Sequence, residues 1–142
     1  MSHLTRHTVE EMRAAGFTYP AYEHFVNIGM LYACGEDEYL IGGSCAAAFT
    51  QQDVTAAESG LWLPGAEQLL EWLKYTDFTA EISMNEDGYF VVQATDQING
   101  AVYTGGGLRL VDALAKVIGK ICKSKKRSYV PREPLRIPIV EE

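Results

Sequence analysis

The residues best suited to hold a ligand lie in one stretch, between an Asn-Gly turn and a helical pattern. Asn99 lies in the turn, Tyr103 supplies an aromatic ring, and Arg109 follows three consecutive glycines. Amides at a helix N-terminus attract anions, and a guanidinium binds phosphate oxygens in pairs. We therefore predict a site for a small phosphorylated ligand. Its predicted residues are Asn99, Tyr103, Gly105, Gly106, Gly107 and Arg109.

A second interpretation, in which this stretch has only a structural role and binds no ligand, stays open. Glycine permits a backbone turn with positive φ and a close approach to another group, so Gly105–Gly107 can simply turn the chain. Arg109 falls in the first turn of the expected helix, where a cation is unfavourable for the helix itself. On this interpretation its guanidinium is only solvated.

The other residues with chemical potential do not form a recognisable catalytic or metal site. Cys45 follows Gly42-Gly43-Ser44 and suggests a nucleophile, but a nucleophile needs a base within hydrogen-bond reach. The histidines all lie near the N-terminus, and the sequence does not bring them to Cys45, which favours a buried thiol. Histidine and cysteine show no zinc-ligand spacing, and phosphate-loop and dinucleotide motifs are absent. We predict a non-enzymatic protein with no catalytic residue, metal or cofactor.

The elements that must position the predicted site form a helix–three strands–helix order over residues 64–123. Helix 64–75 is followed by strand 79–84, a loop at 85–88, strand 89–95, the turn at 96–100 and strand 101–104. Residues 108–122 then carry apolar side chains at helical spacing, with Asp112 and Lys116 placed to pair on the opposite face. Two helices on one face of an antiparallel meander predict an α+β fold.

The N-terminal half is expected to add shorter elements to the same domain. The pattern predicts a helix capped by Thr8 and ended by Gly16, a second helix over 20–29, a hairpin over 30–41 and a third helix over 50–60. The apolar segment 61–64 is expected to dock onto the core. We predict one globular domain over 1–127 and a proline-containing extended tail over 128–142.

Charge is distributed unevenly along the 142 residues. The net charge of −7 divides into −12 for residues 1–115 and +5 for residues 116–142. Because the body is acidic, we do not expect a nucleic-acid partner. Three cysteines without a CxxC motif are typical of reduced thiols, and there is neither a signal peptide nor an apolar run of membrane-spanning length. We expect a cytoplasmic protein without a membrane partner.

Two families share the order of elements in the second half of the chain. The double-stranded RNA-binding domain opens its second helix with a basic cluster, whereas this chain has one cation, Arg109, and one acid, Asp112. Residues 64–123 also resemble the small phage proteins called the phage ABA sandwich, in Tyr103-Thr104-Gly105 followed by the helix around Asp112–Lys116. Similar-sized phage proteins sequester nucleotide immune signals of the host, which implies a nucleotide-like ligand.

The sequence therefore predicts a non-enzymatic binding protein of phage or prophage type that sequesters a small phosphorylated ligand. A homo-oligomer is expected. The alternative is a protein-interaction or regulatory module that acts through oligomerisation, through its tail or through the region of Trp62 and Trp72.

Overall fold

The computed structural model describes residues 3–18, 31–40, 55, 60–124, 126 and 129. The elements in chain order are α1 (Arg6–Ala14), β1 (Leu31–Cys34), β2 (Asp37–Leu40), β3 (Leu61–Leu63), α3 (Ala66–Tyr75), β4 (Phe78–Met84), β5 (Phe90–Asp96), β6 (Val102–Gly107) and α4 (Leu110–Ser124). The predicted helices over 20–29 and 50–60 lie outside the described residues, as does most of the tail over 128–142.

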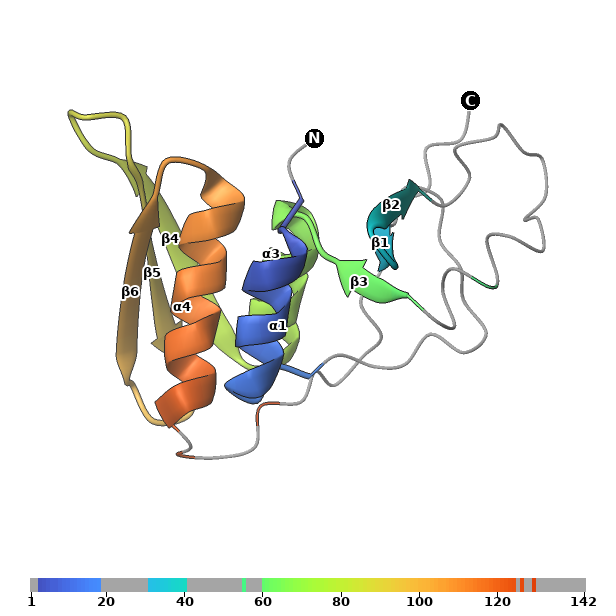
Figure 1. Ribbon diagram of the computed structural model, residues 1–142. Coiled ribbons are helices and arrows are strands. Elements are labelled where there is room, and N and C mark those ends of the chain that lie inside the picture. The colour runs from blue at the N-terminus through green and yellow to red at the C-terminus, as the bar shows by residue number, and fades with distance from the viewer. Residues whose placement is uncertain are drawn as a thin grey trace, which may run out of the picture.

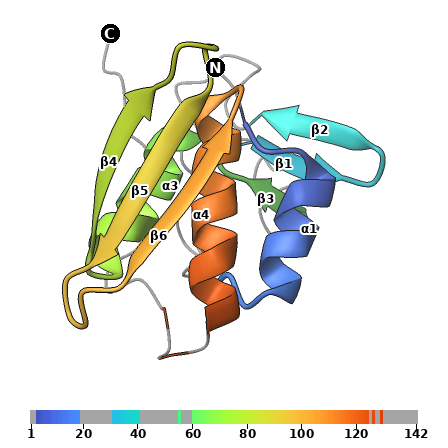
Figure 2. The same ribbon diagram turned by 90° about the vertical axis from the view of Figure 1, so that its left-hand side faces the viewer.

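The helices form a layer between two antiparallel sheets. One sheet has the strand order β2-β1-β3 and the other β4-β5-β6. Figure 1 shows α4, α1 and α3 between them, and Figure 2 shows α4 and α3 behind the β4-β5-β6 sheet. The prediction of an α+β fold with an antiparallel meander packed against helices is confirmed.

The meander turns one row of side chains toward the helices because side chains alternate between the two faces of a strand. Phe90, Val92 and Ala94 of β5 belong to this row, and Val92 and Ala94 are fully buried. Val92 lies opposite Gly105 of β6, and Phe90 lies opposite Gly107. Both glycines therefore belong to the row that faces α4.

The expectation that the three glycines turn the chain is wrong, because they complete β6. None of the three has a positive φ. A Cβ added at Gly105 would lie 2.9 Å from Val117 Cγ2 and 3.0 Å from both Val117 N and Ala113 O. Such distances leave no room for a side chain, so Gly105 lets the backbones of β6 and α4 approach closely.

Helix α1 begins earlier than the capping pattern predicts. Its N-cap is Thr5, whose hydroxyl accepts from the backbone N–H of Thr8, rather than Thr8 itself. Gly16 ends the helix with φ +110°, a conformation that suits glycine, as predicted. At α3 the side chain of Gln68 accepts from the backbone N–H of Gly65 at 2.7 Å, which fixes the start of that helix.

The hairpin of β1 and β2 is confirmed, but the segment after Gly60 is a third strand of its sheet rather than only a docking segment. Trp62 pairs with Tyr32 in this strand, and its side chain is 1 % exposed. Trp72 of α3 is fully buried and donates its indole N–H to Thr18 O at 2.7 Å. The two tryptophans therefore belong to the protein's own core.

A single cluster of buried side chains joins the N-terminal elements to the C-terminal unit. Leu4, Val9 and Tyr32 belong to the same cluster as Leu114 and Ile118 of α4. Described residues from the first sixty thus share the core of the helix–three strands–helix unit.

Tyr129 is the one described residue of the predicted tail. Its side chain is buried, its ring lies 5.8 Å from that of Phe78, and its carbonyl accepts from the Thr18 hydroxyl at 3.3 Å. At this position the tail packs onto the body.

Candidate functional site

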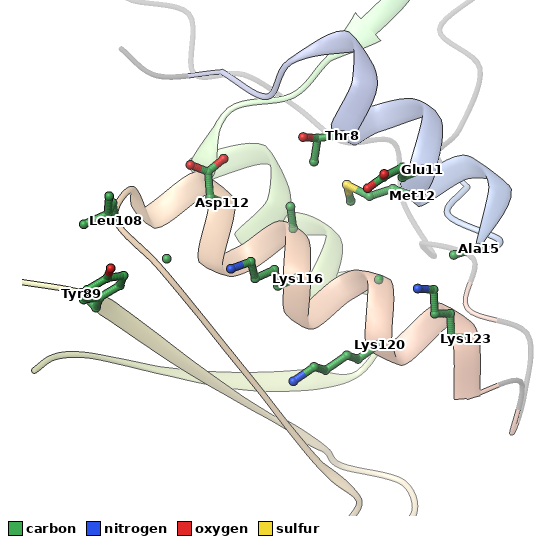
Figure 3. Close-up of a pocket in the computed structure, with 13 residues that line it drawn as sticks. Thr8, Glu11, Met12, Ala15, Tyr89, Leu108, Asp112, Lys116, Lys120 and Lys123 are labelled. Atoms are coloured by element: carbon green, nitrogen blue, oxygen red, sulfur yellow. The ribbon is translucent and has the colours of Figure 1, made fainter.

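A groove of about 650 Å³ lies between α1 and α4 and reaches the start of β5. Figure 3 shows side chains from both helices and from the β5 and β6 ends around it. The residues that line it are Thr8, Glu11, Met12, Ala15, Tyr89, Gly107, Leu108, Asp112, Ala115, Lys116, Gly119, Lys120 and Lys123.

The groove exists because α4 has small residues where it faces α1. Ala115 and Gly119 are four residues apart and therefore lie one above the other on the helix, and Ala15 of α1 lies near the same end. A Cβ added at Gly119 would have no atom within 4 Å. Gly119 therefore borders open space, in contrast to the closely packed Gly105.

Three lysines of α4 form a row along the groove. Lys116, Lys120 and Lys123 recur at four- and three-residue spacing, so their side chains leave one side of the helix. Figure 3 shows the amines of Lys116 and Lys120 extending toward the sheet and that of Lys123 extending toward α1. The Lys120 ammonium donates one hydrogen bond to Thr104 O and keeps two further donors.

One acidic side chain of the groove, that of Asp112, is paired with a cation. Asp112 accepts from Arg109 through both oxygens, at 2.8 Å from Nε and 2.9 Å from Nη2. This hydrogen-bonded contact, more than the accompanying charge attraction, raises the pKa of Arg109. Glu11 lies 2.9 Å from His7 Nε2 on the exposed side of α1. Asp112 is thus held by Arg109 and not, as predicted, by Lys116.

The end of the groove opposite Lys123 is apolar. Tyr89 is 44 % exposed and Leu108 is 67 % exposed, and both line the groove where β5 begins and the chain enters α4. Tyr89 directly precedes Phe90, which pairs with Gly107, and this register brings Tyr89 near Leu108. The groove is therefore apolar at one end and basic at the other.

The structure does not gather the six predicted site residues in one place. Gly107 lines the groove, and Arg109 reaches it only through Asp112. Asn99 lies beyond the other end of β6, about 20 Å away by the rise of six strand residues, where its Oδ1 accepts from Ala101 N at 2.8 Å. The roles of Gly107, Arg109 and Asn99 in ligand binding stay predictions.

Tyr103, Gly105 and Gly106 belong to the sheet rather than to the groove. The ring of Tyr103 packs edge-on against Phe78 at 6.1 Å, and its hydroxyl is buried with no hydrogen-bond partner among the described residues. Gly105 faces α4, and a Cβ on Gly106 would meet Phe90 O at 3.3 Å.

No protein-family model, curated protein or solved structure matches this chain. The part of the chain that the structure describes holds no group of three or more metal-binding side chains. Within the same part, no helix combines the length and the apolar character needed to cross a membrane.

Sequence reasoning missed the lysine row although its signal was present. Lys116, Lys120 and Lys123 recur at helical spacing, but the sequence pattern pairs Lys116 with Asp112 and places all three only within the net positive charge of residues 116–142. The packing of α1 beside this row is a tertiary contact that no local pattern encodes.

Proposed function

We propose that this protein is a non-enzymatic binding protein that holds a small phosphorylated ligand in the groove between α1 and α4. The observation that carries the proposal is the row of Lys116, Lys120 and Lys123 along one groove, beside the Asp112 carboxylate, which is already paired with Arg109. Lysine binds phosphate as a point charge through its three donors.

The uneven charge of the chain favours anion binding at this row of lysines. Residues 1–115 carry −12, so anions are repelled from most of the body. Among the described residues, the cationic side chains that line the groove are the three lysines, all on α4. An anion therefore gains attraction at this row, and this attraction weakens as salt rises.

The buried thiol of α4 is not a candidate nucleophile. Burial raises the pKa of Cys122 to about 11, so the thiol stays protonated at neutral pH. A protonated thiol is a poor nucleophile. The proposal also keeps two expectations from the sequence. One is sequestration of a nucleotide signal, which the resemblance to small phage proteins implies, and the other is a homo-oligomer.

The proposal is tested by isothermal titration calorimetry with pyrophosphate at low salt. Wild type is expected to bind, and Lys116→Gln with Lys120→Gln is expected to weaken binding by at least tenfold. Lys74→Gln is the matched control, because Lys74 lies on α3 outside the groove, over the ring of Tyr75. Absence of binding to wild type, or equal losses in the control, would refute the proposal. Native mass spectrometry of the same samples reports the subunit number.

A further inference from the structure

We infer that the ligand is a nucleoside diphosphate, with its base at Tyr89 and Leu108 and its phosphates at Lys116 and Lys120. This inference rests on the proposed function and adds the class and the orientation of the ligand. It follows from the order of side chains along the groove, which changes from apolar to carboxylate to cationic.

The order of side chains along the groove follows from their four-residue spacing in the sequence. Asp112, Lys116 and Lys120 follow one another at this spacing on α4, Leu108 lies just before the helix begins, and all four line the groove. In a helix, four residues rise by about 6 Å, so successive members reach successive parts of an elongated ligand. A ligand that satisfies all four has an apolar group, a hydroxyl-bearing middle and an anionic end.

The apolar end suits a planar ring. Tyr89 offers a half-exposed aromatic side chain, and Leu108 exposes most of its surface beside it. Stacking of a base on an aromatic side chain is worth about tenfold or more in affinity and tolerates any base, because every base has a π face. The inference therefore does not select one base.

The middle of the groove suits a sugar. Both oxygens of Asp112 accept from Arg109, at 2.8 and 2.9 Å, but each carboxylate oxygen can accept a further hydrogen bond. Because Asp112 is acceptor-only when ionised, it attracts hydroxyl donors and repels phosphate. This places ribose hydroxyls at Asp112 and directs the phosphates onward to the lysines.

The basic end suits more than one phosphate. Lys116 and Lys120 lie one turn apart on α4, and their amines extend to the same side in Figure 3. One phosphate attached to a ribose at Asp112 reaches the amine of Lys116, and a second phosphate extends toward Lys120. A diphosphate should therefore bind more tightly than the matching monophosphate.

The test compares ADP, GDP, CDP and UDP with pyrophosphate by calorimetry on wild type, Tyr89→Ala and Tyr89→Phe. Pyrophosphate has the same two phosphates and no nucleoside, so it isolates the contribution of the ring and the sugar. We expect at least one nucleoside diphosphate to bind wild type about tenfold more tightly than pyrophosphate. Tyr89→Ala should remove most of that advantage and leave pyrophosphate affinity unchanged, and Tyr89→Phe should retain it.

The outcomes separate this inference from the proposed function. If pyrophosphate binds through the lysines but no nucleoside diphosphate binds more tightly, the inference is overturned and the phosphate site stands. Equal losses for pyrophosphate and nucleotide in Tyr89→Ala also overturn it. If pyrophosphate and the nucleotides all fail to bind, both proposals are overturned.

Discussion

Gly105 of β6 lies directly against Val117 of α4, so that a Cβ at residue 105 would come within 3.0 Å of the Val117 backbone nitrogen. Backbone atoms cannot turn aside as the end of a side chain can. The glycine thus sets the distance between the sheet and the helix that carries the lysine row. The same contact therefore affects both the packing of the fold and the position of the groove.

Replacement of Gly105 by alanine should destabilise the protein by about 1–3 kcal/mol, because overpacking forces β6 and α4 apart. The free energy of unfolding from urea titration measures this loss. Gly119→Ala is the control on α4: its added methyl meets open space, and alanine stabilises a helix interior by about 0.5–1 kcal/mol over glycine. A Gly105→Ala variant as stable as wild type would contradict the close contact.

Arg109 should act on ligand binding through Asp112 rather than by direct contact. Arg109→Gln leaves the carboxylate of Asp112 uncompensated in the groove and should weaken pyrophosphate binding severalfold. Asp112→Asn removes that negative charge and should strengthen pyrophosphate binding. Because the pair is partly exposed, neither change should alter stability by more than about 1 kcal/mol.

The double variant Arg109→Gln with Asp112→Asn separates the two roles of Arg109. If Arg109 only neutralises Asp112, the double variant should bind pyrophosphate about as well as wild type. If the guanidinium contacts the phosphates, as the sequence predicts, the double variant should bind clearly more weakly than wild type. Calorimetry on the four proteins decides between them.

Leucine at position 119 should close the groove without disturbing the fold. The position is open on the groove side, and leucine favours the helix more than glycine does. We expect Gly119→Leu to reduce pyrophosphate binding at least tenfold while leaving the free energy of unfolding equal or higher. All three lysines remain in this variant. An unchanged dissociation constant would show that the ligand binds elsewhere.

Cys122 should resist alkylation in the folded protein up to high pH. Burial raises the pKa of its thiol to about 11, above the 9.0 of an exposed cysteine, because the charged thiolate is disfavoured inside the protein. Between these two values the unfolded chain loses its proton and the folded chain keeps it, so this group lowers stability as pH rises from 9 toward 11. Iodoacetamide labelling followed by peptide mass spectrometry should show little modification of Cys122 at pH 8. Rapid labelling of native protein at that pH would contradict the burial.

Hydrophobic periodicity allowed the C-terminal unit to be predicted because it is a local property. The apolar spacing of α4 and the alternation in β5 each depend on residues close in sequence. The cap of α1 was misplaced at Thr8 because Thr5 and Thr8 are both suitable residues and only the observed backbone distinguishes them. The strand β3 was missed because three residues carry no measurable period, and its pairing with β1 joins distant segments.

The sequence by itself determined the helices and the antiparallel meander of the C-terminal unit and the acidic body, because side-chain patterns and formal charges need no tertiary contact. Only the tertiary structure decided that Gly105 packs against α4, since a tight turn and a close approach both call for glycine. The tertiary structure also decided the candidate site. Lys116 and Lys120 became the wall of a groove when α1 packed beside α4, and the register of β5 and β6 placed Tyr89 at its apolar end.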